Sequence, residues 1–542
     1  MKADRVLYNG RLYTMDPARP RASAIAIAGE RILAVGDDEA MRDLLDPGGE
    51  AINLEGRTVV PGFVDAHVHL LQTALLQDSL SLEALPSPQA ILTAVAGCLR
   101  RTEPGQWLVG FGWDEHRWPG WRPSRAQLDG VSPHHPVVLL RHDGHTAWAN
   151  SRALLRAGIT AQTPDPPGGL IHRLPNGEPS GLVSEAAVDL LMQAIPPPPP
   201  EKRRSLLRQV MARANAAGLT GVHEIPFRND VPVIRQDYQA LADAGQLTLR
   251  VTLMLHSEQF EEAMASGLRT GDPVVVGQPA LATWLRWGPV KWFTDGALGS
   301  GTAAMLEPYV GRGEDRGILR LSSEEIAGIL RRANAAGLAC AFHAIGDAAN
   351  RHVVEALERV RGEGGETGAP RHRIEHGQHI HPDDVVRMGR LGVTVVAQPT
   401  HLADDMALCE RALGERARWA YPLADLLRAG VHLAFSSDSP IADFSPLTAI
   451  YHAVTRRRLD GHPGPDGFEP AQRLTISQAV AAYTTGAAYA SGEETVKGSL
   501  TPGKLADLVI LSQEVFALPP VELLNTAVVA TMVGGRFVHR GF

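Results

Sequence analysis

Two histidines end an apolar segment near the N-terminus. His67 and His69 follow the valine-rich run at residues 58–66 and are separated by Val68. In a β-strand, residues two apart point to the same face, so we expect both imidazoles to project together from the C-terminal end of a strand. Imidazole is a common ligand of zinc and of its first-row neighbours. Among 21 histidines the pair alone is a weak signal, and its alternative interpretation is a solvated pair at a strand end.

A lysine inside an apolar segment is the second unusual feature. Lys291 is flanked by Val290 and Trp292. A buried ammonium group is costly unless it is paired, neutralised or used in chemistry. Three more polar residues end predicted strands, and they are His343, His376 and Asp438. Each alone has the alternative interpretation of a hydrogen-bonded core residue. On four separate strands, together with the histidine pair, they favour a metal site.

The elements that would position these residues follow a repeating order of helix, glycine and strand. The heptapeptide at residues 213–219 recurs unchanged at 332–338, and in both copies a helical pattern ends at a glycine before an apolar strand. Gly392 and Gly430 stand at the same place in two further copies of this order. Glycine accommodates the left-handed backbone at a helix C-terminus, and strands fed by helices are typical of parallel βα units.

Eight segments have the composition of buried parallel strands. They are residues 58–66, 220–223, 249–255, 290–294, 339–342, 373–375, 393–397 and 431–435. Eight such units predict an α/β fold, the TIM-type (β/α)8 barrel, whose active site lies at the C-terminal ends of the strands. The polar residues named above stand at or near those ends.

Both ends of the chain are predicted to be β-structure outside the barrel. Residues 6–13 have the pattern of a hairpin with an Asn9-Gly10 turn. A few strands from either end could not bury a face alone. We therefore expect both ends to form one small β-sandwich domain. The predicted boundaries are 1–58 and 499–542 for this domain and 59–498 for the barrel.

An insertion is expected after the first barrel strand, because the chain from about residue 70 to 200 is too long for one βα connection. We place the insertion at about 105–200. One interpretation is a lid on which Trp113, Trp118 and His145 shape a substrate pocket. The alternative is that the tryptophans form the insertion's own small core, and aromatic content alone does not choose between the two.

Composition limits the classes of function. A net charge of -8 without a basic stripe argues against nucleic acid. No apolar run is long enough to cross a bilayer, and no signal-peptide core precedes the first strand. The three cysteines are widely separated in the sequence. We therefore expect neither a disulfide framework nor a zinc site with thiolate ligands. We expect a cytoplasmic enzyme acting on a small molecule, and the sequence is compatible with a homodimer.

Taken in order, these motifs resemble the amidohydrolase superfamily of metal-dependent hydrolases. Within it they look most similar to the N-substituted formamide deformylase-like branch. The resemblance covers nearly the whole chain. The segments that carry it are residues 61–69, 291–300, 343–347, 373–376, 437–440 and 502–508.

The resemblance implies a role for each residue of the set. In binuclear members of the superfamily the lysine is N-carboxylated and bridges two divalent metals, which would be Lys291 in this chain. The remaining ligands would be His67, His69 and Asp438 for one metal and His343 and His376 for the other. The resemblance implies a divalent metal, expected to be zinc, with one or two ions per chain. Asp438 is the catalytic residue expected to accept the proton of the attacking water and to pass it to the leaving nitrogen.

The predicted function is hydrolysis of a carbon–nitrogen bond other than a peptide bond, in an amide, formamide or carbamate of a small molecule. A deaminase of a heterocyclic ring is the alternative within the superfamily. Such deaminases resemble a pattern with a glutamate three residues after the histidine of strand five, where this chain has Gly346. Ester or lactone hydrolysis remains open. A non-catalytic scaffold is least favoured, because all six ligand positions are filled. If Asp438 is not the base, His401 or His223 would take that role.

Overall fold

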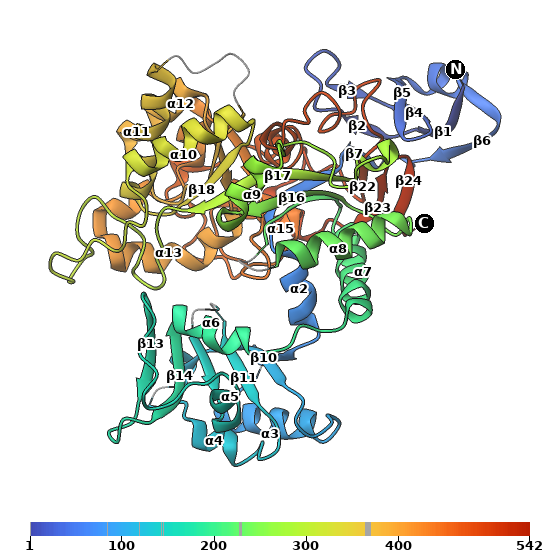
Figure 1. The fold of residues 1–542 in the computed structure, drawn as a ribbon. Helices are drawn as coiled ribbons and strands as arrows, with labels where there is room; N and C mark the ends of the chain where they lie inside the picture. The colour runs from blue at the N-terminus through green and yellow to red at the C-terminus, as the bar shows by residue number, and fades with distance from the viewer. Residues whose placement is uncertain are drawn as a thin grey trace. The chain divides into compact units, whose positions relative to one another are not determined.

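A computed structural model describes residues 2–83, 85–118, 120–142, 144, 146–226, 230–363 and 370–541. The chain divides into two compact units (Figure 1). The first unit comprises Met1–Leu70 together with Arg208–Phe542, and it holds both chain ends and the predicted barrel strands. The second unit comprises Leu71–Leu207.

The first unit contains eight parallel strands whose order in the sheet is their order in the sequence. They are β8 (Phe63–Val68), β15 (Leu219–Glu224), β16 (Arg250–His256), β17 (Leu285–Phe293), β18 (Cys340–Ala344), β19 (Arg373–His376), β20 (Thr394–Ala397) and β21 (His432–Phe435). Just beyond β21, the backbone N–H of Asp438 donates to the carbonyl of His67 at 2.8 Å, which brings this segment beside β8. The sheet is therefore a nearly closed barrel of eight strands, as predicted, although the first strand begins later than the predicted run at residues 58–66.

Helices connect the barrel strands, and Figure 1 shows α10, α11 and α12 side by side along the barrel. The glycines predicted to end α10 and α12 have a left-handed backbone, with φ of 72° at Gly337 and 62° at Gly392. A capping box between Ser322 and Glu325 begins α10. The longer helices are α7 (Pro200–Ala216), α8 (Val231–Asp243), α10 (Ser323–Ala336), α11 (Asp347–Gly362), α12 (Pro382–Leu391), α13 (Pro399–Leu413) and α15 (Pro446–Thr455). Shorter ones are α1 (Asp38–Arg42), α9 (Phe260–Ala265), α14 (Leu423–Arg428), α16 (Ile476–Ala481) and α17 (Ala487–Ala490).

The two chain ends form two further sheets. One has the order β5 (Arg31–Gly36), β4 (Ala24–Ala28), β1 (Ala3–Tyr8) and β6 (Leu45–Asn53). The other has the order β24 (Arg536–Arg540), β23 (Val528–Val533), β22 (Leu508–Leu511), β7 (Thr58–Pro61), β2 (Arg11–Tyr13) and β3 (Arg21–Ala22). Side chains from both sheets, such as Ile27 and Ile510, belong to one buried apolar cluster. Strands from both chain ends therefore pair in one sheet, with β7 between β22 and β2.

The predicted hairpin at residues 6–13 is wrong. β1 pairs with β4 and β6, whereas β2 pairs with β3 and β7, so the two strands belong to different sheets. Asn9 has a left-handed φ of 57°, and the N–H of Gly10 donates to the carbonyl of Ser23. The turn leads from one sheet into the other because the shared core takes Leu7 from β1 and Leu12 from β2.

The apolar run at residues 58–66 is two strands instead of one. β7 ends at Pro61 and pairs with β22, whereas β8 begins at Phe63 and pairs with β15. Gly62 stands between them, and a Cβ atom at this position would lie 2.7 Å from the Cβ of Thr220. This contact is too close for any side chain. Gly62 therefore joins β7 of the terminal sheets to β8 of the barrel.

The second unit is the insertion between β8 and β15. Its six-stranded sheet has the order β13 (Gly169–Arg173), β14 (Pro179–Glu185), β12 (Thr146–Ala149), β11 (Val137–Arg141), β10 (Leu108–Trp113) and β9 (Leu80–Ser81). Its helices include α2 (Leu70–Gln77), α3 (Pro88–Leu99), α4 (Arg125–Asp129), α5 (Ser151–Arg156) and α6 (Ala186–Gln193). None of the helices in the described parts of the chain combines the length and hydropathy that a bilayer crossing needs.

Candidate metal centre

The C-terminal rim of the barrel brings His67, His69 and Asp438 together. Nε2 of His67 lies 3.1 Å from Oδ1 of Asp438, and Nε2 of His69 lies 3.2 Å from the same oxygen. Backbone hydrogen bonds hold the two segments side by side, since Asp438 N–H donates to His67 and His69 N–H donates to Ser439 at 2.9 Å. Both imidazoles of the histidine pair point to one place, as the strand periodicity predicts.

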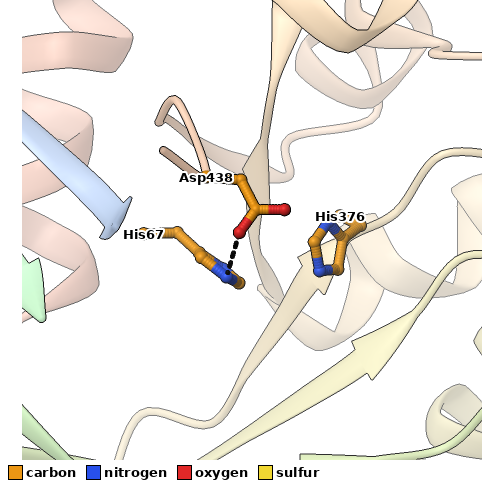
Figure 2. Close-up of side chains that lie close together, drawn as sticks. All are labelled: His67, His376 and Asp438. Atoms are coloured by element: carbon orange, nitrogen blue, oxygen red, sulfur yellow. Dashed lines mark ion pairs between the residues drawn. The ribbon is translucent and has the colours of Figure 1, made fainter. Parts of the chain in front are cut away.

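His376 and His343 come from β19 and β18 and extend this cluster. The ring centroid of His376 lies 4.9 Å from that of His67 and 4.5 Å from that of His343. One ligand atom from each of His67, His376 and Asp438 lies within 4.8 Å of the others. Figure 2 shows the Asp438 carboxylate directed between the rings of His67 and His376. His376 and Asp438 have positive φ angles of 75° and 59°, a conformation that is rare outside glycine and concentrates at functional sites.

Hydrogen bonds outside the cluster fix the rings of the histidine pair. Nδ1 of His67 lies 2.6 Å from Oε2 of Glu375, and Nδ1 of His69 lies 2.7 Å from the carbonyl oxygen of Ile225. A backbone carbonyl can only accept, so Nδ1 of His69 carries a proton and donates it. Nδ1 of His67 donates to the Glu375 carboxylate in the same way. The Nε2 atom of each ring is then left facing Asp438.

The other two imidazoles are oriented by amide and carbonyl oxygens. Nδ1 of His376 donates to Oε1 of Gln398 at 3.0 Å, which leaves its Nε2 for the cluster. His343 has the opposite orientation. Its Nε2 donates to the carbonyl of Gly296 at 3.0 Å, which leaves its Nδ1 for the cluster. Partners of this kind, which hold the remote ring nitrogen, are typical of metal-binding histidines.

Lys291 is buried in β17 close to the cluster. Its Nζ has no hydrogen-bond partner among the described residues, and it lies 5.4 Å from the ring centroid of Phe293. Burial lowers the pKa of Lys291 to about 8, although the carboxylates of Glu375 and Asp438 oppose the shift. A larger fraction of this amine is therefore neutral near neutral pH than for a lysine in water. A neutral amine is nucleophilic, as lysines used in covalent chemistry are.

Electrostatics keep His343 and His376 neutral and the Asp438 carboxylate ionised. Burial lowers the pKa of His343 to about 3, and the charge of Lys291 adds to the shift. Burial, with a contribution from His343, also holds the pKa of His376 well below its ordinary value. Burial alone would raise the pKa of Asp438, but the nearby His67 ring outweighs it, and the pKa lies well below the ordinary value. His343 and His376 thus present neutral nitrogens, and Asp438 presents an ionised carboxylate.

This donor set fits a divalent metal ion. With Nδ1 of His67 and His69 protonated, both Nε2 atoms direct lone pairs toward an Asp438 oxygen that has no proton to offer. Such groups repel one another unless a second proton or a cation lies among them, and a metal ion is the cation that suits this geometry. Neutral imidazole and carboxylate are the ligands that zinc takes in catalytic sites.

Of the two alternative bases, only His401 lies beside the cluster. It stands near the start of α13, with Nε2 4.0 Å from Oδ2 of Asp438. His223 instead faces the barrel interior, where its Nδ1 accepts a hydrogen bond from Arg373 at 2.9 Å. Burial and the Arg373 charge hold the pKa of His223 well below its ordinary value, so it stays neutral.

The tryptophans of the insertion lie in the apolar core of the second unit. Trp113 is fully buried, and its ring packs edge-on against Trp121 and Trp148 at centroid distances of 6.3 and 6.2 Å. Trp118 is half-buried and packs against Trp121 at 5.5 Å. For Trp113 this arrangement favours the interpretation of a small internal core over that of a pocket wall. His145, also considered for the pocket, lies outside the described residues.

Sequence reasoning missed Glu375 and Gln398, which orient two of the imidazoles. Gln398 directly follows the last residue of β20, the same position at which the other polar residues stood out, so that rule could have found it. Glu375 precedes His376 inside β19, where it was treated only as part of the strand. A charged residue within a short barrel strand is the signal that could have identified it.

Comparison with known proteins agrees with this geometry. Residues 50–539 match the model of the amidohydrolase family. The chain belongs to that family. The resemblance inferred from the motifs is therefore confirmed at the level of the superfamily.

This amidohydrolase is similar to its relatives along nearly its whole length. It is 35% identical to Protein LONG AFTER FAR-RED 3 of Arabidopsis thaliana, over 99% of this chain and 92% of that protein. It is 31% identical to the N-substituted formamide deformylase of Arthrobacter pascens, over 98% of this chain and 97% of that protein. Among solved structures, an uncharacterized metal-dependent hydrolase from Pyrococcus horikoshii OT3 matches with a TM-score of 0.79 and 26% identity. That match covers 95% of this chain and 99% of the other.

Proposed function

We propose that this amidohydrolase hydrolyses a carbon–nitrogen bond other than a peptide bond, in an amide, formamide or carbamate of a small molecule. The observation that carries the proposal is the convergence of His67, His69 and Asp438 at one end of the barrel, with His376 beside them. The similarity to an N-substituted formamide deformylase over nearly the whole chain supports the choice of bond.

The proposal includes a resident metal, expected to be zinc, with one or two ions per chain. His67, His69, Asp438 and Lys291 would hold one ion, and Lys291, His343 and His376 would hold the other. When bound, the metal would supply a Lewis acid that polarises the substrate carbonyl and makes water more acidic. The donors that the chain offers are hard or borderline nitrogens and oxygens, which suit this class of ion.

Lys291 is proposed to be N-carboxylated. In that reaction the ammonium first loses one proton. The neutral amine then attacks the carbon of carbon dioxide, forms a new N–C bond while one C–O π bond opens, and releases a second proton, so that a cationic group becomes an anionic one with two oxygens. Two observations support it, namely that Nζ is buried without a partner among the described residues and that burial lowers its pKa. A carbamate at this place would supply oxygen ligands in addition to the Asp438 carboxylate.

Asp438 is proposed to move the proton. One of its oxygens, Oδ1, already faces the histidine pair, while Oδ2 lies toward His401. Oδ2 would accept a proton from the attacking water and deliver it to the leaving nitrogen, which must be protonated before the amine departs. The backbone bond from Asp438 N–H to the carbonyl of His67 keeps the carboxylate in place for both transfers.

Metal content and hydrolysis together test the proposal. Elemental analysis of protein purified without chelator should find one or two zinc-like ions per chain, and less than about one ion per ten chains would contradict it. A screen of metal-loaded protein over N-acyl amines, formamides, carbamates and esters should then find a carbon–nitrogen substrate. Turnover of esters or lactones alone would replace the proposed bond class while leaving the metal site intact.

Substitution of Lys291 tests the carbamate. Lys291→Ala should lose activity and regain part of it with a small carboxylate added, because the added group can take the position of the carbamate. Electron density that shows an unmodified ammonium group away from the ions in fully loaded protein would contradict this part of the proposal. The site would then be held by the histidines and Asp438 alone.

A further inference from the structure

The interior of the barrel contains a charged residue where such barrels are usually packed with branched aliphatic side chains. Arg373, the first residue of β19, is buried completely, with a relative exposure of 1%. Moving a guanidinium group out of water is costly unless its donors are satisfied. Its contacts therefore indicate what it does.

Arg373 contacts side chains and backbone from four strands of the barrel. Its Nε donates to Oε1 of Glu375 at 2.5 Å, on β19 itself. One terminal nitrogen donates to Nδ1 of His223 on β15 at 2.9 Å. The other lies 3.2 Å from the carbonyl of Ala66 on β8 and 3.0 Å from the sulfur of Met254 on β16. One side chain thus links the strand of His67 to the strand of His376 across the interior.

These contacts form a chain of hydrogen bonds that ends at a candidate metal ligand. A guanidinium can only donate, so both oxygens of Glu375 act as acceptors, one for Arg373 and the other for His67. The acceptor at Oε2 requires the proton of His67 to sit on Nδ1. In the neutral ring Nε2 is then unprotonated, and it faces Asp438.

We propose that Arg373 and Glu375 are positioning residues that fix the tautomer and orientation of His67 and thereby set the metal affinity of the rim. The inference rests on the proposed function, because it requires that the rim binds a metal. Neither residue touches the reacting atoms. Arg373 acts through Glu375, and Glu375 acts through His67.

The geometry explains why these two residue types are needed. The planar fork of arginine presents several donors in fixed directions, so it can hold Glu375, His223 and Ala66 at the same time, which the single ammonium of lysine cannot do. A glutamine in place of Glu375 would put its NH2 group where one of the two carboxylate oxygens lies, so a donor would face either Arg373 or His67. Either change would remove one link in this series of hydrogen bonds while nearly preserving side-chain volume.

Metal affinity of the variants tests the inference. The proteins to compare are the native chain, Glu375→Gln and Arg373→Met, each titrated with zinc against a chelating indicator. Loss of a partner that orients a metal-binding histidine typically weakens binding by roughly 10–100-fold. We expect a weakening of this size in both variants, with the kcat of fully loaded protein affected less than the metal dissociation constant.

Arg250 provides a matched control. It is buried, and it donates to both oxygens of Asp507 at 2.7 and 3.0 Å, but it starts β16 at the opposite end of that strand from the rim. Arg250→Met should lower the unfolding temperature as Arg373→Met does, yet leave the zinc dissociation constant within a few-fold of native. A merely structural role for Arg373 would give the two variants the same pattern.

The outcomes separate the two proposals. If native protein binds no zinc, the proposed function fails. If native protein binds zinc and folded Glu375→Gln binds it within about threefold of native, the positioning role is overturned. Should Arg373→Met not fold, Glu375→Gln decides the question, since it keeps the side-chain volume.

Discussion

At the scale of single residues, two members of the rim have an unusual backbone conformation. His376 and Asp438 hold backbone conformations that cost non-glycine residues of the order of 1–3 kcal/mol each. Backbone contacts of their neighbours maintain them, such as the bond from Asp438 N–H to the carbonyl of His67. The barrel fold thus contributes to the positions of these two side chains.

Substitution of Asp438 by asparagine should separate proton transfer from binding. The variant keeps the size and one oxygen of the side chain but loses its basicity, so kcat should fall by roughly 10²–10⁴-fold while most of the metal is retained. The rate and the metal content are to be measured on the same sample. Asp460→Asn, on an exposed loop, is the control and should leave both unchanged.

An Asp438→Asn variant within a few-fold of native activity would exclude this carboxylate as the base. His401 would then be the alternative base to examine, because its Nε2 lies 4.0 Å from Oδ2 of Asp438. His223 is excluded from that role by its hydrogen bond with Arg373 in the barrel interior.

Residue types at strand ends predicted the cluster, but not the groups that orient it. His67, His69, His376 and Asp438 could be found because each ends an apolar strand, and parallel strands end at a common rim. Glu375 could not be found in that way, because its role depends on a contact with His67, which lies about 300 residues away in the chain. Sequence periodicity carries no information on such a pairing.

At the scale of elements, a neutral histidine joins α10 to β18 and β19. Nδ1 of His372 accepts from the N–H of Cys340 at 3.0 Å, and Nε2 donates to Oδ1 of Asn334 at 2.8 Å. The bond from Cys340 requires the uncharged ring, because a protonated Nδ1 cannot accept. Burial lowers the pKa of His372 to about 4.

The stability of the protein should therefore depend on pH through His372. The unfolded chain binds a proton near pH 6.5 and the folded chain only near pH 4, so this contribution is complete above 6.5 and is lost as the pH falls toward 4. The loss amounts to about 3 kcal/mol, at about 1.36 kcal/mol per unit. His372→Asn keeps an acceptor for Cys340 and cannot titrate, so urea unfolding should show a smaller decline over this range. Parallel curves for the two proteins would contradict the assignment.

The junction at Gly62 is a second feature at this scale. An alanine Cβ would overlap the side chain of Thr220, whose hydroxyl donates to the carbonyl of Phe63 at 3.1 Å. Gly62→Ala should destabilise the protein by roughly 1–3 kcal/mol, the usual cost of overpacking. Gly328→Ala in α10, where nothing lies within 4 Å, should instead stabilise it by roughly 0.5–1 kcal/mol. Chemical denaturation of both variants checks the contrast, and equal effects would refute it.

The elements that the sequence predicted best are those with local signals. Glycines at helix ends identified the βα units, because a residue with a left-handed backbone ends a helix through its local conformation alone. The hairpin at residues 6–13 failed because an Asn-Gly turn specifies only the local backbone. Whether the next strand pairs with the previous one or with another sheet is decided by the distant core that Leu7 and Leu12 share.

At the scale of the whole molecule, the second unit has a core of its own, and Trp113 lies in that core. Its ring is fully buried, and Nε1 donates to the carbonyl of Leu139 at 2.7 Å. Trp113→Ala should cost roughly 3–5 kcal/mol of stability and leave the metal content unchanged. Trp118→Ala, at a half-buried position, should cost less. Calorimetry with relative rates on two substrates decides the matter, and altered substrate preference at unchanged stability would restore the interpretation as a pocket wall.

The pairing of β7 with β22 has a consequence for how the protein is made. Pro61 lies opposite Leu508 in this pair, so the partner strand leaves the ribosome about 450 residues later. At about 5–20 residues per second, β7 waits roughly 20–90 seconds for its neighbour during synthesis. All four of its residues are buried in the finished protein, so for that time an apolar strand edge is open to other chains. Production in a cell should therefore depend on chaperones that cover nascent chains, more than the stability of the completed fold would suggest.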